Sequence, residues 1–325
     1  MLEIAIQILG IFAMIGVGVA ATRRQWFSPD FSTQLSTLLL RVFYPSLLFS
    51  AILRKYTLAQ VLENWVLPVG AGGIMVTGWL VGWVAKRTIV RHYRAPTRRA
   101  FHFSCTMNNY SFLPIMIVAG MPQGETLVAM VALTTIASDT LMWTLGFRTF
   151  TGRRLSWRAL PGMLMRPPIL ALFSALVVLV GLYFAGIDNA ALMQWLPTRV
   201  ALETLSKYLG GATIPASAIV CGMRLGQLSL KGLLVPLQLW VAALRMVMIP
   251  AVALAVLCVL PLAPEVRLIL GVIALMPGAM VGVSMAEVYG GDIPFVSAMI
   301  LNTHVLCIVT VPLGLWVLKA CSMVG

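Results

Sequence analysis

Long apolar runs, separated by short charged or proline- and glycine-rich stretches, occupy most of this sequence and constrain its fold more than any other feature. A transmembrane helix needs about 20 apolar residues, whereas a membrane β-barrel would show alternating segments of about ten residues. These runs do not alternate, so the sequence predicts an all-α integral membrane protein. We expect ten transmembrane helices, at about residues 2–22, 31–53, 60–85, 98–120, 124–147, 167–187, 194–226, 232–261, 265–289 and 293–319.

The composition agrees with a chain that lies almost entirely in lipid. Of the 325 residues, 60% are hydrophobic and 10% are charged, while soluble domains carry about 25% charged residues. Ten spans with their loops fill this length and leave no room for a soluble domain of ordinary size. The function must therefore lie among the helices.

The formal net charge of +13 is unevenly distributed along the chain. Basic residues are concentrated in two loops, at Lys86, Arg87, Arg91, Arg94, Arg98 and Arg99, and at Arg148, Arg153, Arg154, Arg158 and Arg166. With ten spans, fifteen Lys and Arg residues fall on one side and six on the other. Because cytoplasmic loops are enriched in Lys and Arg, we interpret the charge as a topology signal, not as a nucleic-acid footprint. We expect a multi-pass protein of the plasma (inner) membrane with both termini non-cytoplasmic.

Five predicted spans precede the Arg148–Arg166 loop and five follow it, which places any duplicated units in opposite orientations. The segment YPSLLFSAILR from Tyr44 is similar to IPASAIVCGMR from Ile214, and the pair Ser138–Asp139 lies 165 residues before the pair Thr303–His304. We therefore expect two inverted five-helix repeats, residues 1–150 and 151–325.

Two predicted spans contain helix-breaking residues near their centres. The fourth has Asn108 and Asn109 ahead of Pro114, and the ninth has Pro277 and Gly278. Proline interrupts the helical hydrogen bonds, and a broken helix in a bilayer is expected where it lines an enclosed cavity. The N-terminal ends of half-helices suit a carboxylate, so these five residues are candidates for substrate binding. The alternative is that both prolines are tolerated kinks and that the amides bond neighbouring helices.

Ionisable residues inside the predicted spans are a second set of candidates, because a charge in hydrocarbon is costly. Arg245, central in span 8, is a candidate for contact with an anion, although it can also snorkel or pair with Asp139 or Glu287. Asp139 and His304, at matching depths in spans 5 and 10, are candidates for proton coupling, with a neutral core histidine as the alternative for His304. Glu287, at the end of span 9, suits either gating or simple solvation.

Other classes of function find less support in the residues. The three histidines are scattered, so we expect no metal site, and no cofactor is expected. The motifs HExxH and GxSxG are absent from the sequence, and a membrane-embedded enzyme is therefore not expected. A channel would need a continuous polar lining, whereas polar residues gather only in spans 4, 5, 9 and 10.

The segment from Pro277 through AEVYGGD to the end of span 10, with its late Pro312, resembles the auxin efflux carrier family. That family includes plant PIN-type auxin exporters and bacterial malonate or malate carriers. In span 4, NYSFL from Asn109 matches in part the family pattern Asn-x-Gly-Phe-Leu-Gly-x-Pro. Ser111 and Pro114 stand where that pattern has glycines, and Met116 stands where it has proline.

The resemblance implies an alternating-access secondary transporter of small organic anions, such as malonate, malate or auxin-like acids. It implies a scaffold of spans 1, 2, 6 and 7, often a homodimer interface, and a transport domain of spans 3–5 and 8–10 whose broken fourth and ninth helices cross at the substrate. A sodium-coupled symporter of the bile-acid type shares the five-plus-five plan and stays open as an alternative. Its ion sites would need clustered carboxylates and amides, for which this chain offers Asn108, Asn109, Asp139 and Glu287.

Overall fold

A computed structural model describes residues 2–28, 30–153, 165–187, 195–228 and 235–324 of the chain. Within these ranges the regular structure is helical, and the one pairing of extended backbone is an isolated antiparallel bridge between Asn108 and Gly278. The prediction of an all-α protein is confirmed for this part of the chain.

The helices of the N-terminal half are interrupted once by an extended segment and twice by π-helical turns, which are labelled η. They are α1 (Leu2–Arg23), α2 (Phe31–Leu38), η1 (Leu39–Phe43), α3 (Tyr44–Lys55), α4 (Leu58–Glu63), α5 (Val66–Thr88), α6 (Ala95–Thr106), α7 (Phe112–Ala119), α8 (Gly124–Leu141), η2 (Met142–Gly146) and α9 (Phe147–Thr151).

The C-terminal half has the same kinds of interruption. Its described elements are α11 (Pro167–Phe184), α13 (Leu196–Thr204), η4 (Leu205–Gly210), α14 (Thr213–Gln227), α15 (Pro236–Ala243), η5 (Leu244–Met248), α16 (Ile249–Val259), α17 (Pro264–Ala274), α18 (Val281–Tyr289) and α19 (Ile293–Val324).

Six continuous helical segments of the described residues are long and apolar enough to cross a membrane. They are Phe31–Lys55, Leu58–Thr88, Gly124–Thr151, Pro167–Phe184, Pro236–Val259 and Ile293–Ala320. The predicted fourth and ninth spans are each divided into two helices of eight to twelve residues, so neither half alone spans a bilayer. The total of ten spans stays a prediction.

Local sequence explains where many of these helices begin and end. A proline occupies one of the first two positions of six helices that follow a loop or turn, α6, α11, α13, α15, α17 and α19. Proline suits that place because its missing N–H would have no partner within the helix anyway. At the other end, Gly152 and Gly290 follow α9 and α18 with φ of 73° and 71°, a left-handed conformation that glycine adopts without steric cost.

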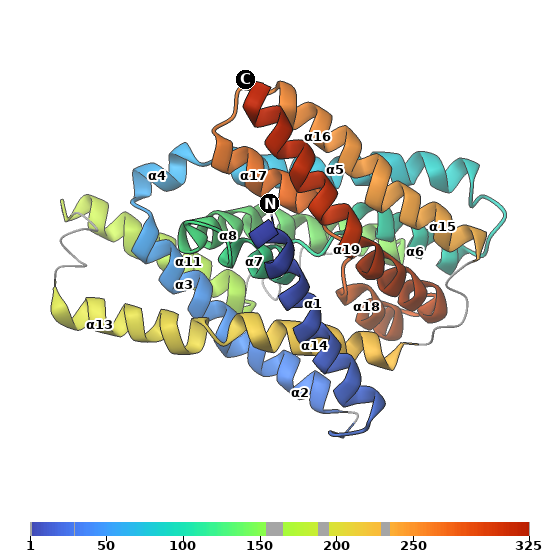
Figure 1. The fold of residues 1–325 in the computed structure, drawn as a ribbon, viewed down its shortest axis with the longest axis horizontal. Coiled ribbons are helices and arrows are strands. Elements are labelled where there is room, and N and C mark those ends of the chain that lie inside the picture. Colours follow the sequence, from blue (N-terminus) through green and yellow to red (C-terminus); the bar gives the residue numbers. More distant parts are fainter. Residues whose placement is uncertain (1, 29, 154–164, 188–194, 229–234, 325) are drawn as a thin grey trace.

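The helices pack in two groups (Figure 1). In the first helix group, α14 packs against α1 and α2, while α3 packs against α11 and η4. In the second helix group, α5 packs against α6, α8 and α17, and α19 packs against α15, α16 and α17. The groups meet where α3 contacts α8 and where α14 contacts α7.

Close backbone contact holds α1 to α14. A Cβ added at Gly222 would lie 1.9 Å from the carbonyl oxygen of Ile15, and one added at Gly18 would lie 2.3 Å from that of Ile219. Any larger residue at either position would force the two helices apart. These two glycines therefore allow α1 and α14 to pack in direct backbone contact within the first helix group.

Candidate functional site

The two interrupted helices meet at their breaks. The first break is the extended segment 107–111 between α6 and α7, and the second lies between the end of α17 and the start of α18. Asn109 N–H donates to the carbonyl oxygen of Pro277 at 2.8 Å, and Ala279 N–H donates to that of Met107 at 3.1 Å. The backbone groups that have no intrahelical partner at one break are thus hydrogen-bonded to the other interrupted helix.

Polar side chains satisfy further groups around this crossing. The Asn108 side-chain amide donates to the carbonyl oxygen of Ile273 at 2.6 Å, and the Gly278 N–H donates to the Thr303 hydroxyl at 3.2 Å. Asn108 and Thr303 are completely buried. The crossing is therefore held by a buried polar network inside the second helix group.

Both breaks are followed by a helix whose first turn is not capped by a side chain. Ser111 precedes α7 and Met280 precedes α18, and neither side chain accepts a hydrogen bond from the turn that follows. Such helix N-termini carry partial positive charge and unpaired N–H groups. They suit a negatively charged partner.

A cavity of about 420 Å³ lies between the two helix groups beside this crossing. Ser111, Phe112, Met280 and Val281, at the starts of α7 and α18, are among its lining residues. The first helix group contributes residues of α2, η1, α3 and α14. The polar and ionisable side chains that line it are Ser36, Thr37, Arg41, Tyr44, Asn108, Asn109, Tyr110, Ser111, Asp139, Arg166, Ser217, Arg224 and Ser284.

Positive charge exceeds negative charge in the cavity lining, because Arg41, Arg166 and Arg224 stand against the single carboxylate of Asp139. Asp139 accepts a hydrogen bond of 2.5 Å from the Tyr110 hydroxyl. Arg166 lies with its guanidinium carbon 3.5 Å from the centre of the Trp143 ring. The guanidinium is attracted by the negative face of that ring.

Within the described part of the chain, Arg224 is hydrogen-bonded only to neutral side chains of the cavity lining. It is partly buried, and its guanidinium donates to the hydroxyls of Ser36 at 3.3 Å and Ser284 at 3.5 Å. Among the described residues no carboxylate lies within ion-pair distance of it. Two weak hydrogen bonds to neutral hydroxyls leave most of its charge uncompensated.

Three of the nine predicted site residues line the cavity, namely Asn108, Asn109 and Asp139. Pro277 and Gly278 lie in the second break and are not among the residues that line the cavity. Pro114 is buried within α7, three residues after its N-cap Ser111, so the first break lies ahead of this proline and not at it. Proline is tolerated there because the first turn of a helix has N–H groups without intrahelical partners.

The other three predicted residues lie outside the cavity lining. Arg245 is completely buried and donates to backbone carbonyls, and no described carboxylate pairs with it. His304 is buried in α19, with Nδ1 2.8 Å from the carbonyl oxygen of Ile300 in the same helix. Glu287 is exposed on α18.

Sequence reasoning did not single out Tyr110, Arg166 or Arg224. Tyr110 lies inside the NYSFL motif, and Arg224 ends the repeated segment IPASAIVCGMR, so both were within patterns that the sequence displays. Arg166 belongs to the basic loop that the topology rule explains by itself. The rule accounts for the charge of these arginines but does not reveal which of them turn toward a cavity.

Comparison with known proteins agrees with the family resemblance. Residues 3–161 match the model of a family described as "Membrane transport protein". The chain is also 24% identical over 178 residues to Protein PIN-LIKES 5 of Arabidopsis thaliana. That match covers 49% of this chain and 44% of the plant protein, so the chain aligns with less than half of its relative's length. The resemblance to the auxin efflux carrier family is confirmed, and it agrees with the expectation that the chain is not an enzyme.

Proposed function

We propose, from the premise that this chain resembles the auxin efflux carrier family of membrane transporters, that it is a secondary transporter of small organic anions. Its substrates would be carboxylates such as malonate, malate or auxin-like acids. The observation that carries this proposal is the cavity beside the crossing. Its lining combines two uncapped helix N-termini and three arginines with a single aspartate. An anion entering this cavity meets a net positive lining.

Electrostatics supports Arg224 as the anchor for a substrate carboxylate. A unit charge 4 Å from another interacts with about 4 kcal/mol at an effective dielectric constant of about 20. Glu287 is the acidic group whose charge acts on Arg224, but it lies beyond ion-pair distance and is exposed. A bidentate carboxylate can therefore approach the guanidinium without displacing an existing ion pair.

The size of the cavity also suits a small substrate. A volume of about 420 Å³ lies near the lower end of the range of about 300–1,000 Å³ that is typical of ligand pockets. Apolar side chains such as Met116 and Ile169 line it together with the polar groups. Small mono- and dicarboxylates, with a short apolar body and charged ends, match this mixture.

Alternating access is the mechanism we propose, with two inverted five-helix repeats that supply the two broken helices. The scaffold would be the first helix group and the moving part the second, and the packing of α5, α8, α17 and α19 around the crossing supports this division. The cavity lies between the groups, so a displacement of one against the other would open and close it. A homodimer through the scaffold is proposed on the family resemblance alone.

A plasma-membrane location with both termini outside is part of the same proposal. It rests on the excess of Lys and Arg in loops such as residues 86–99. It would place the end of the cavity that carries Arg166 and Arg224 on the cytoplasmic side. Labelling of single cysteines with a membrane-impermeant reagent should then mark Gln123 from outside and Arg153 from inside.

The experiment that tests the proposed function compares Arg224→Gln with Arg199→Gln in proteoliposomes. Arg199 is an exposed arginine of α13 that pairs with Glu203 at 3.9 Å, so its variant controls for loss of a positive charge. Wild type and the control should accumulate a radiolabelled carboxylate, chosen beforehand as the one that most raises the melting temperature. Arg224→Gln should lower the initial rate by at least about tenfold, since a charged hydrogen-bond pair is worth about 1.5–3 kcal/mol. Equal rates for the two variants would exclude Arg224 as the anchor.

A further inference from the structure

Arg245 is the largest completely buried side chain among the described residues. It lies in η5, the π-helical turn Leu244–Met248 between α15 and α16. Its guanidinium donates to three backbone carbonyl oxygens, those of Met276 at 3.0 Å, Ala274 at 3.3 Å and Cys105 at 3.4 Å. No described carboxylate pairs with it.

These three carbonyls come from the places where the two interrupted helices end. Cys105 lies in the last turn of α6, Ala274 is the last residue of α17, and Met276 lies in the second break. The last carbonyls of a helix lack intrahelical partners and carry partial negative charge. Arg245 therefore places its charge against two helix C-termini at once.

A convergence of carbonyls from unwound backbone and half-helix C-termini is the kind of site that coordinates Na⁺ in transporters with broken helices. A guanidinium has the same unit charge and adds five directed N–H donors. Burying a charge costs several kcal/mol unless hydrogen bonds and opposite charge compensate it. The carbonyls of the two helix ends supply this compensation, which explains how an arginine is tolerated at this depth.

We infer that Arg245 is a covalently attached cation that holds the two half-helix C-termini together in place of a coupling sodium ion. The inference rests on the proposed transport function and deepens it. Assembly of the substrate site then needs no bound alkali cation, and transport by the wild type is independent of sodium. Arg245 is a positioning residue, because it does not line the cavity.

The first test leaves the protein unchanged. Wild-type proteoliposomes should take up the labelled carboxylate equally well in NaCl and in choline chloride. The melting temperature of the solubilised protein should also be the same in the two salts. A requirement for a sodium gradient would overturn the inference while leaving anion transport intact. Absence of carboxylate uptake in every salt would instead contradict the proposed function.

The second test removes and restores the cation. Arg245→Ala should lower the initial rate of uptake by at least about tenfold, since it removes three charged hydrogen bonds. Low millimolar guanidinium chloride should restore part of the rate and raise the melting temperature of this variant only. Arg199→Ala, at an exposed ion pair, is the matched control and should respond to no added cation.

A conservative variant keeps the inference testable if Arg245→Ala does not fold. Arg245→Lys retains the charge and should keep more uptake and a higher melting temperature than the neutral, similarly long Arg245→Met. The melting temperature measures assembly of the crossing without any substrate. Equal stability of the Lys and Met variants, or a folded Ala variant that guanidinium does not stabilise, would show that the charge is not what Arg245 contributes.

Discussion

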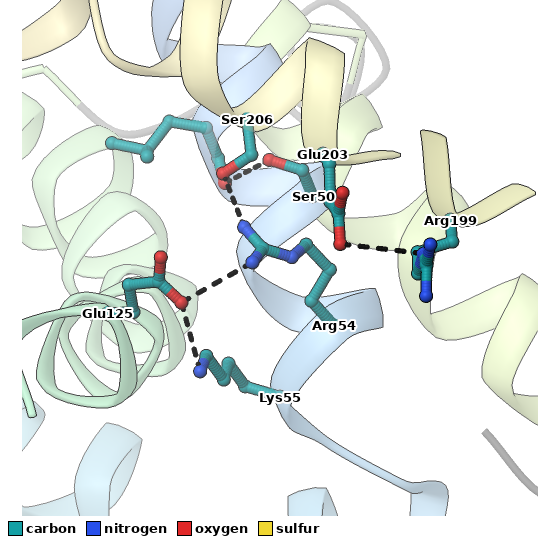
Figure 2. Close-up of polar contacts among 8 residues, drawn as sticks. Ser50, Arg54, Lys55, Glu125, Arg199, Glu203 and Ser206 are labelled. Atoms are coloured by element: carbon teal, nitrogen blue, oxygen red, sulfur yellow. Dashed lines mark hydrogen bonds and ion pairs between the residues drawn. The ribbon is translucent and has the colours of Figure 1, made fainter. Parts of the chain in front are cut away.

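The two ends of the contact between the helix groups differ in what fills them. At the end that carries Arg166 and Arg224, the groups are separated by the cavity of about 420 Å³. At the other end α3 and α8 are joined directly, because Glu125 pairs with Lys55 at 3.0 Å and with Arg54 at 3.4 Å. Figure 2 shows Arg54 placed between Glu125 and Ser206, whose hydroxyl accepts a hydrogen bond of 2.9 Å from Arg54.

The same two helices take part at both ends. Glu125 in the first turn of α8 and Asp139 near its end are fourteen residues apart, which corresponds to about 21 Å along a helix. One end is therefore open and polar while the other is closed by charge pairs. In the alternating-access cycle proposed above, the structure would correspond to the state in which the end of Glu125 is closed by ion pairs and the cavity lies at the end of Arg166 and Arg224.

The largest effect should come from restoring a continuous helix at one of the two breaks, because this would change the cavity at the open end. In Pro277→Ala the second break can wind further, because proline disfavours a helix interior by about 3 kcal/mol relative to alanine. Uptake should fall at least about tenfold while the melting temperature is unchanged or higher. Asn109→Ala should also weaken uptake, since it removes an amide that lines the cavity.

Pro312 supplies the matched control for the repaired helix. It lies inside α19 and does not line the cavity, so Pro312→Ala should leave uptake close to that of the wild type. Normal uptake by both Pro277→Ala and Asn109→Ala would reject the crossing as the substrate site.

An intermediate effect is expected on the pH dependence of transport. This measurement distinguishes an ionisable residue that lines the cavity from one that lies in the surrounding core. Asp139 lines the cavity and is bonded to Tyr110, whereas His304 is enclosed in the core against its own helix. If transport is coupled to protons, Asp139→Asn should flatten the rate profile between about pH 5 and 8 while substrate binding survives. His304→Gln should keep the wild-type profile.

The reverse outcome for these two variants would assign proton coupling to the core histidine. Should both variants keep the wild-type profile, neither residue titrates during transport. A uniporter driven by the electrochemical gradient of the anion would then be the better description.

The smallest effect should come from the closed end. Exposed ion pairs contribute about 0.2–1 kcal/mol, and the Glu125 side chain is 64% exposed. Glu125→Gln should therefore raise the population open at that end by about 1.4- to 5-fold. The measurement is the rate at which Cys221, which lines the cavity, reacts with a membrane-impermeant thiol reagent added from the side of Glu125.

A pair within one helix group controls for the charge change. Glu203 pairs with Arg199 inside α13, so Glu203→Gln should leave the labelling rate of Cys221 unchanged. Because the Glu125 effect is electrostatic, it should also decrease at high salt. A Glu125→Gln variant with the labelling rate of the wild type would mean that these ion pairs do not hold the closed end.

Sequence patterns predicted the helical fold and located both breaks, because apolar runs, prolines and adjacent amides are local signals. The exact position of the first break was harder to predict from the sequence. Pro114 marks the first turn of α7 and not the break itself, since proline is compatible with the start of a helix.

The candidate site was predicted less completely, because its arginines owe their roles to contacts between distant segments. Arg224 meets Ser36 across 188 residues and Ser284 across 60. Arg245 reaches Cys105 across 140 residues. A sequence shows that such a charged side chain lies within an apolar segment. It does not show whether the side chain will contact carboxylates, backbone carbonyls or a cavity.

The backbone bridge between the two breaks has a consequence for biosynthesis. Asn109 N–H and the carbonyl oxygen of Met107 have their partners at Pro277 and Ala279, about 170 residues later in the chain. At about 5–20 residues per second, the ribosome needs roughly ten to thirty seconds to deliver those partners. During this interval we expect the first broken helix to sit in the insertion machinery or the bilayer with unpaired backbone groups, each costing several kcal/mol in lipid. The N-terminal half of the chain therefore depends on the completion of the second half, and truncation before Pro277 should leave a product that cellular quality control degrades.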